Sequence, residues 1–313
     1  MKLFTRTRNF SSIAVSAVIL LSLAFSRIID ETDISWQVAI ALFALAVGIP
    51  HGALDHLVAL PRASIKRMSL FVLIYVLIAV LAVFAILQWN VYGFIGVVVM
   101  SALHFGIGDT AFINELERAR GSVRVNRLTQ VLYALTAGAL PVLIPLTNKE
   151  STSALAAVND ELINWHGGLD QELTNLVTGM YLVTVLVLSA NRRWRDLIDI
   201  NLLLLLAFFT PPLVAFAAYF GTWHAMRHTA RLTLNLKSSQ ESLSKDRPAK
   251  AFRQAILPGV PALVGTFIVS LAIALFTPGK LSDEFLWLSL VVVWALTVPH
   301  MIVTARLDKA ALR

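Results

Sequence analysis

The chain has 313 residues, of which 57% are hydrophobic and 14% charged. An average soluble domain carries about 25% charged residues, so this composition indicates an integral membrane protein and excludes disordered, collagen-like and disulfide-rich secreted classes. The absence of cysteine excludes zinc ribbons, iron–sulfur clusters and thiol catalysis. The net charge of +7 would suggest a nucleic-acid partner in a soluble protein, but in a membrane protein it reports on orientation, and no nucleic acid is expected.

Ten apolar segments follow one another along the chain, each long enough or nearly long enough to cross a bilayer core, which takes about 20 helical residues. The sequence therefore predicts an all-α fold, a polytopic membrane helical bundle that forms a single domain over residues 1–313. The segments cover residues 10–29, 35–56, 69–88, 91–108, 128–146, 174–190, 197–210, 213–231, 256–277 and 285–304.

Residues 197–231 are counted as two of these segments because Pro211 and Pro212 interrupt them. A single helix of this length would measure about 50 Å at 1.5 Å per residue, which is too long for one crossing of a ~30 Å core. Proline also lacks a backbone donor and disfavours helix at the preceding residue. We therefore expect two segments that meet at the prolines.

The distribution of basic residues predicts the orientation. If the N-terminus is cytoplasmic, 23 of the 26 Lys and Arg residues fall on cytoplasmic segments, and Arg27, Lys149 and Lys280 remain on the other side. The positive-inside rule describes this asymmetry, and it predicts a multi-pass protein of the cell (inner) membrane with both termini in the cytoplasm. Residues 147–173 then form an extracytoplasmic loop, and residues 232–252 form a cytoplasmic loop.

The first segment, residues 10–29, has two interpretations. It follows the basic residues 1–8, and Ala24–Ser26 resembles a cleavage site, so removal as a signal peptide is an alternative to a first span or signal anchor. Cleavage would leave nine segments in the same orientation.

Six of the seven histidines fall near the predicted cytoplasmic ends of their segments. A lone buried histidine is usually a hydrogen-bonding residue, but several helices that deliver imidazole rings to one depth favour a metal site near the cytoplasmic side. His224 and His228 are four residues apart, so both rings share one helix face. The six are His51, His56, His104, His224, His228 and His300, whereas His166 lies in the outside loop and receives no role.

The ligand type limits the choice of metal. Such a site would be nearly all imidazole, which suits Fe, Cu, Zn or Ni, and the spacing does not choose among them. The carboxylates at the same depth are Asp55 and Asp109. Asp55 follows His51 by four residues, so it can act as a ligand or accept a hydrogen bond from a ligand ring. A di-iron centre is disfavoured because the chain has too few His and carboxylate ligands for it.

Four short motifs carry a resemblance to a known family. The segments PHGALD at 50–55, HFGIGD at 104–109, WHAMRH at 223–228 and VPHM at 298–301 occur in this order. In these motifs the chain resembles the Brp/Blh family of membrane β-carotene 15,15′-dioxygenases, over residues from about 40 to 305. The motif combination is highly specific, although His56, the first segment and the long 147–173 loop are outside it.

The resemblance implies a mononuclear non-haem iron, Fe(2+), bound by four histidines. These ligands would be His51, His104, His224 and His228. His300 matches a motif position without a ligand role, and Asp55 and Asp109 would lie beside the ligands, Asp55 as a hydrogen-bond acceptor for a ligand ring.

The reaction implied by the resemblance is cleavage of the central double bond of β-carotene by O₂ into two retinal molecules, with a microbial rhodopsin as a candidate receiver. The substrate would enter from membrane lipid, and the absence of flavin and nicotinamide motifs fits a reaction without an external reductant. Aromatic residues near the ligands are candidates for the substrate tunnel, with lipid-facing packing as the alternative: Phe105, Phe216, Tyr219, Phe220 and Trp223.

Two other functions remain open. A related membrane iron oxygenase would carry the same motifs and act on another carotenoid or isoprenoid. A transporter would use the histidines as a proton or metal-ion relay. The transporter is disfavoured because the sequence has no inverted repeat and the histidines gather at one end of the segments.

Overall fold

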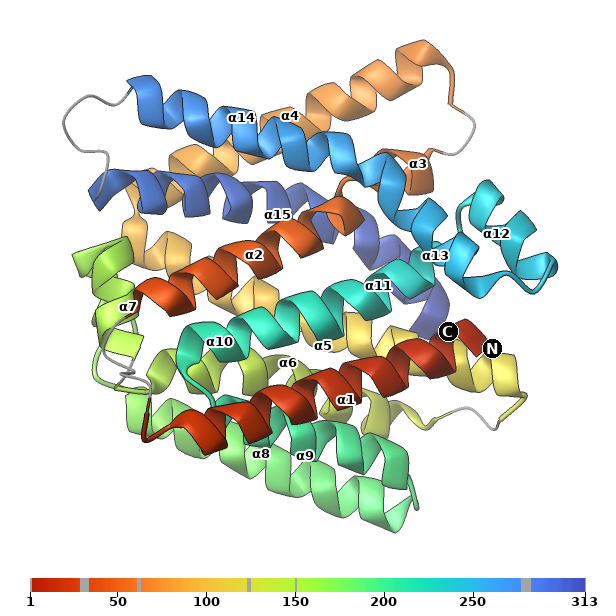
Figure 1. Cartoon of the computed structure of the whole chain (residues 1–313), viewed down its shortest axis with the longest axis horizontal. Coiled ribbons are helices and arrows are strands. Elements are labelled where there is room, and N and C mark those ends of the chain that lie inside the picture. Colours follow the sequence, from red (N-terminus) through yellow and green to blue (C-terminus); the bar gives the residue numbers. More distant parts are fainter. Residues whose placement is uncertain are drawn as a thin grey trace.

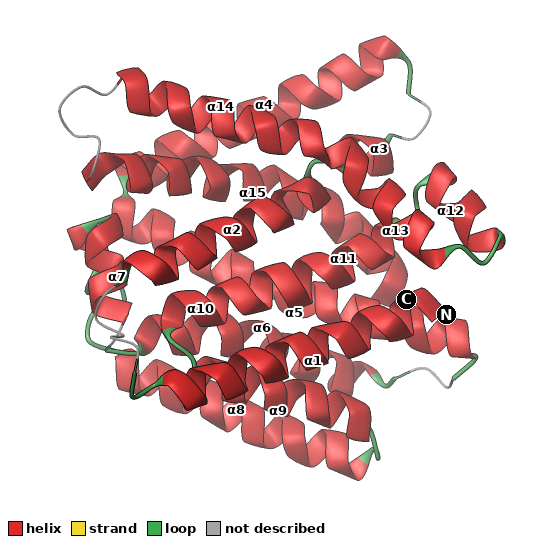
Figure 2. Cartoon of the chain, in the orientation of Figure 1, coloured by secondary structure: helices red, strands yellow, loops and turns green. Residues whose placement is uncertain are grey.

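The computed structural model describes residues 2–28, 34–60, 63–122, 125–149, 151–276 and 283–312. Within these ranges the secondary structure is helical, with turns and short loops and no strand, as Figure 2 shows. The helices form one bundle, in which α1, α2 and the α10–α11 helix lie side by side (Figure 1). The predicted all-α fold is confirmed. Arg62, Arg124, Lys280 and Arg313, which contribute to the predicted charge asymmetry, lie outside the described residues.

The bounds of the elements follow in chain order. They are α1 (Lys2–Phe25), α2 (Ser35–Gly52), α3 (Asp55–Ala59), α4 (Ile65–Gln88), α5 (Asn90–Arg120), α6 (Arg127–Thr147), α7 (Ser151–Val158), the 3-10 turn η1 (Asp160–Leu162), α8 (Asp170–Ala190), α9 (Trp194–Phe209), α10 (Pro212–Ala217), the π-helical turn η2 (Ala218–His224), α11 (Ala225–Leu232), α12 (Lys237–Ser244), α13 (Pro248–Ile256), the 3-10 turn η3 (Leu257–Gly259), α14 (Val260–Phe276) and α15 (Asp283–Leu312).

Eight helices of the described part of the chain are long and apolar enough to cross a membrane, by length and composition. They are Lys2–Phe25, Ser35–Ala59, Ile65–Gln88, Asn90–Arg120, Arg127–Thr147, Asp170–Ala190, Pro248–Val269 and Trp287–Leu312. These helices indicate a membrane protein. The count of ten segments and the cytoplasmic position of both termini stay predictions, since α9 has 16 residues and falls short of a full span.

The chain between residues 197 and 231 divides at the prolines, as the sequence predicts. Helix α9 ends at Phe209, Thr210 and Pro211 have extended backbone with ψ near 140°, and α10 begins at Pro212. Proline disfavours helical backbone in the residue before it, which accounts for the break. From Pro212 the helix continues through η2 into α11, so the motif WHAMRH crosses a π-helical turn.

Both long polar connections contain helices. Residues 147–173 carry α7 and η1, and residues 232–252 carry α12 and the start of α13. The first of them packs against the bundle, because Leu155, Leu162 and Trp165 are buried in the core. The described residues of this segment thus form a cap over one end of the bundle.

The contact between α5 and α6 depends on two glycines. A Cβ atom at Gly106 would lie 1.7 Å from the carbonyl oxygen of Ala134, and one at Gly138 would lie 1.8 Å from that of Ala102. Small residues let membrane helices approach closely. This contact fixes α5 at the point where His104 projects into the bundle.

Candidate metal and substrate site

Five imidazole rings converge inside the bundle, from α2, α5, η2, α11 and α15. They belong to His51, His104, His224, His228 and His300, and each residue is between 3% and 7% exposed. Eight pairs of these rings have centroids between 5.0 Å and 6.4 Å apart. The structure therefore brings together the four histidines expected as ligands and adds His300.

Two other histidines lie apart from this cluster. His56 is partly buried on α3, with its Nδ1 3.1 Å from the carbonyl oxygen of Ala53. His166 follows η1 and packs against Trp165, with ring centroids 5.6 Å apart. Neither has a ring contact with the five clustered histidines among those recorded for the described residues.

Local structure explains how three of the rings are presented. His224 ends the π-helical turn and His228 lies one turn later on α11, so their rings stack with an interplanar angle of 26°. His51 follows Pro50 in the last turn of α2. The WHAMRH helix therefore presents His224 and His228 from one face, one turn apart, at the junction of the π-helical turn and α11.

The histidine cluster contains unsatisfied nitrogen atoms. Buried polar groups without a hydrogen bond are costly, yet several ring nitrogens here are buried with no partner in the protein. They are Nδ1 of His51, Nε2 of His104, His224 and His300, and both ring nitrogens of His228. A shared metal ion would satisfy them, and the donor set is the imidazole type that transition metals accept.

The rings are close to, but not in, a ligating arrangement. Within the described residues no group of three or more His, Cys, Asp and Glu side chains is arranged to hold a metal ion. Imidazoles that share one ion through bonds of about 2.1 Å have centroids roughly 4.5–6.5 Å apart. The observed centroid separations fall in this range, so the helices already give the rings the spacing that a metal centre needs.

Asp55 is hydrogen-bonded to His300 and not to His51, the ring that the spacing suggested. Both carboxylate oxygens are 3.0 Å from Nδ1 of His300, and the hydroxyl of Tyr75 donates to Oδ2 at 3.0 Å. Asp55 and His300 are 5% and 6% exposed. The sequence singled out Asp55 but not Tyr75, and it did not pair Asp55 with His300. The signal available for that pair was the position of His300 near the same end of its segment as the other histidines.

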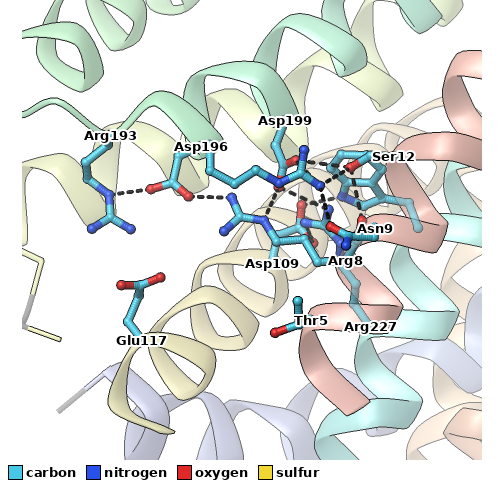
Figure 3. A network of polar contacts seen from close by, with 12 residues as sticks. Thr5, Arg8, Asn9, Ser12, Asp109, Glu117, Arg193, Asp196, Asp199 and Arg227 are labelled. Atoms are coloured by element: carbon cyan, nitrogen blue, oxygen red, sulfur yellow. Dashed lines mark hydrogen bonds and ion pairs between the residues drawn. The ribbon is translucent and has the colours of Figure 1, made fainter. Parts of the chain in front are cut away.

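Asp109 takes part in a buried charge network with Arg227 and Asp199 (Figure 3). It accepts a hydrogen bond from Nε1 of Trp223 at 2.6 Å and pairs with Arg227 at 3.2 Å. Arg227 also pairs with Asp199 on α9 at 3.1 Å. Asp109 therefore positions the helix that carries His224 and His228 and does not contact a histidine ring in any recorded hydrogen bond.

The first helix is part of this network. Arg8 on α1 is 2% exposed and pairs with Asp199 at 2.9 Å and with Asp196 at 2.5 Å (Figure 3). Asp196 also pairs with Arg193. Ionisable residues within or beside apolar segments are the sequence signal for such a network.

A cavity of about 460 Å³ opens from the histidine cluster, a volume within the usual range for small-molecule sites. His51, His104, His224 and His300 form one part of its wall, and Val158 and Leu162 of the α7–η1 cap form another. Most of the remaining wall is aliphatic or aromatic. The space is therefore suited to an apolar ligand that reaches the imidazoles.

Three of the five aromatic tunnel candidates line this cavity: Phe105, Phe216 and Phe220. The centroid of the Phe105 ring is 4.5 Å from that of His224, and Phe216 stacks on Phe220. Tyr219 and Trp223 are fully buried and are not among the lining residues. Trp223 is occupied elsewhere, since the Arg227 guanidinium lies 3.6 Å from its ring centroid.

Comparison with known proteins agrees with the resemblance in the motifs. The family profile described as beta-carotene 15,15'-dioxygenase matches residues 42–308. A relative from Halobacterium salinarum, described as "Probable beta-carotene 15,15'-dioxygenase Blh", is 29% identical over 289 residues, which cover 85% of this chain and 82% of the relative. A "Beta-carotene 15,15'-dioxygenase" of an uncultured marine bacterium is 24% identical over 273 residues, 82% of this chain and 88% of the relative. No solved structure matches. With most of its length matched by the profile, the chain belongs to the beta-carotene 15,15'-dioxygenase family.

Proposed function

We propose that this protein cleaves the central 15,15′ double bond of β-carotene with O₂ and releases two molecules of retinal. The observation that carries the proposal is the apolar cavity of about 460 Å³ whose wall includes four buried imidazoles. Family membership supports carotene as the substrate class. The names of the relatives and the chemistry of the site support the 15,15′ double bond as the bond that is cleaved and retinal as the product.

The metal in this proposal is a mononuclear non-haem iron, Fe(2+), bound by His51, His104, His224 and His228. The unpartnered buried nitrogens of these rings support it. Neutral imidazoles suit iron and leave its positive charge largely uncompensated. The chemistry that bound iron supplies is activation of O₂ for addition to the alkene.

The protein's own side chains bind and shield the polyene. Phe105 and Phe220 lie beside the His224 ring, with centroids 4.5 Å and 6.1 Å away, and give the apolar chain an aromatic wall next to the imidazoles. Exclusion of water by such a wall protects reactive intermediates from hydrolysis. Each central carbon gains one oxygen atom as the double bond breaks, so O₂ and the alkene balance two aldehydes without another reductant.

The proposed reaction takes place within a membrane. The enzyme would lie in the inner membrane with the histidine cluster toward the cytoplasmic side, take β-carotene from membrane lipid and release retinal, for which a microbial rhodopsin is a candidate receiver. The apolar composition and the membrane-length helices support the lipid route.

Expression in β-carotene-producing cells tests the proposal. Loss of colour with retinal as the product identified by chromatography is the expected result, and His51→Ala should abolish it while His166→Ala should not. An aldehyde of another length would move the cleavage site, and cleavage of a different carotenoid alone would change the substrate. Unchanged pigment with a well-folded protein would overturn the proposed activity.

A further inference from the structure

We infer that His300 is a fifth imidazole of the metal centre and that Asp55 and Tyr75 hold its ring in position. This inference rests on the proposed function for the identity of the metal, Fe(2+). The four-histidine set in the first three motifs leaves the last motif without a role. The geometry around Asp55 supplies that role.

The position of the His300 ring is equivalent to that of the other four. Its centroid is 5.2 Å from that of His104, 5.4 Å from that of His51 and 5.5 Å from that of His228. These separations lie within the 5.0–6.0 Å found between His104 and His224 and between His224 and His228. His300 thus has ring contacts with three of the other four histidines, as many as His51, His104 and His224 each have.

The two nitrogens of His300 have opposite environments. Nδ1 lies 3.0 Å from each carboxylate oxygen of Asp55, so Nδ1 carries the proton and donates. The ring then has its lone pair on Nε2, which is buried and has no hydrogen-bond partner. A histidine with one nitrogen on a carboxylate and the other free is the usual arrangement of a metal ligand.

Asp55 is itself held and lacks another compensating charge. Tyr75 on α4 donates to its Oδ2 at 3.0 Å, and the carboxylate is 5% exposed. Among the described residues the recorded ion-pair partner of Asp55 is His300, with no Lys or Arg. A buried carboxylate needs a positive charge nearby, and a cation bound at Nε2 of His300 provides it through the ring.

The arrangement joins helices that the four-histidine set does not use. His300 adds α15 to the centre, and Asp55 and Tyr75 connect it to α3 and α4. Tyr75 also lies 3.4 Å from the carbonyl oxygen of Leu296, one turn before His300 on α15. A fifth ligand from α15 would therefore close the ring of helices around the metal.

Metal affinity tests the inference independently of cleavage. Purified protein, stripped of metal in detergent, is titrated with Fe(II) under anaerobic conditions against a chelator of known affinity. His300→Ala should bind Fe(II) at least about tenfold more weakly than wild type, and Asp55→Ala should lose about 10–100-fold, the usual cost of removing the carboxylate behind a ligand. Asp55→Asn should lose less because its amide oxygen still accepts from Nδ1, and Tyr75→Phe should lose least.

Matched variants separate this effect from general destabilisation. His166→Ala, Asp160→Asn and Tyr181→Phe remove the same groups at positions outside the cluster and should keep wild-type affinity. Co(II) bound in place of iron gives a second readout, because its visible absorption depends on coordination number, and His300→Ala should change that spectrum. A monodisperse His300→Ala protein with wild-type affinity and an unchanged Co(II) spectrum would overturn the inference, whatever its activity.

The two proposals fail separately. If wild-type protein binds iron, His300→Ala loses affinity and changes the Co(II) spectrum, but carotenoids stay intact, the proposed function is wrong and the five-ring centre stands. If wild-type protein yields retinal while His300→Ala keeps its affinity and spectrum, the function stands and the fifth ring is wrong.

Discussion

The indole Nε1 of Trp223 donates a 2.6 Å hydrogen bond to the carboxylate of Asp109, although the two residues are 114 positions apart in the chain. Trp223 precedes His224, and Asp109 follows His104 by five residues on α5. This contact therefore fixes the relative position of two of the helices that supply imidazoles. Arg227, which lies against both residues, adds an ion pair to the same junction.

Asp109→Asn should destabilise the protein strongly. The substitution removes the charge from one side of a buried ion pair, and breaking such a pair costs about 3–5 kcal/mol. The measurement is the midpoint of thermal unfolding in detergent, with the exposed Asp160→Asn as the control. A midpoint for Asp109→Asn within the error of the control would show that Arg227 is sufficiently compensated by Asp199.

Gly106→Ala should impair folding, whereas Gly96→Ala on the same helix should be tolerated. A Cβ at Gly106 would overlap the carbonyl oxygen of Ala134, but no atom lies within 4 Å of a Cβ at Gly96. Overpacking typically costs about 1–3 kcal/mol, and here the obstacle is backbone that cannot rotate away. The yield of monodisperse protein and the thermal midpoint compare the two variants. Equal behaviour would argue against the close α5–α6 contact.

Ala154→Phe should reduce activity toward β-carotene by raising KM, because Ala154 lines the cavity at the α7 end, away from the histidines. We expect kcat/KM to fall by about tenfold or more. A tenfold loss corresponds to about 1.4 kcal/mol of lost transition-state stabilisation. A shortened apocarotenoid should be affected less. Ala157→Phe, an exposed position on the same helix, is the control. Equal losses for long and short substrates would show that this end of the cavity does not receive the polyene.

Metal removal should abolish cleavage, and Fe(II) should restore it. The expected content is about one iron per chain, because the imidazoles form a single cluster. His224→Ala and His228→Ala should stay inactive after Fe(II) is added, since each lacks one of two rings on the same helix face. Elemental analysis and retinal formation are measured on the same samples. Stoichiometric zinc, or two irons per chain, would contradict a mononuclear iron centre.

The N-terminal helix should remain in the mature protein. Arg8 is buried against Asp196 and Asp199, so removal of residues 1–26 would leave two buried carboxylates without this partner. Intact-mass measurement of protein purified from membranes through a C-terminal tag should give the full-length chain. A mass that lacks these residues would instead identify the segment as a cleaved signal peptide.

Sequence motifs predicted which histidines meet, because their types and positions near segment ends are local properties. The partner of Asp55 was not predictable in the same way. The i,i+4 spacing from His51 assumes one continuous helix, but α2 ends at Gly52 and α3 begins at Asp55, so the carboxylate reaches α15 instead. Trp223 was expected in the tunnel because it adjoins His224, yet a buried indole N–H needs an acceptor, and Asp109 provides it. Ion pairs between α1 and α9 depend on tertiary packing and leave no periodic pattern in the chain.

The Arg8 contacts also bear on the order in which the protein is assembled during synthesis. Arg8 leaves the ribosome early, but Asp196 and Asp199 are made 188 and 191 residues later. A buried arginine without a partner is costly, so we expect the first helix to be translated to reach its final place only after α9 has been made. The N-terminal helix should therefore dock only after more than half of the chain has been made, and ribosome-stalled chains that stop before α9 should leave α1 accessible to the insertion machinery.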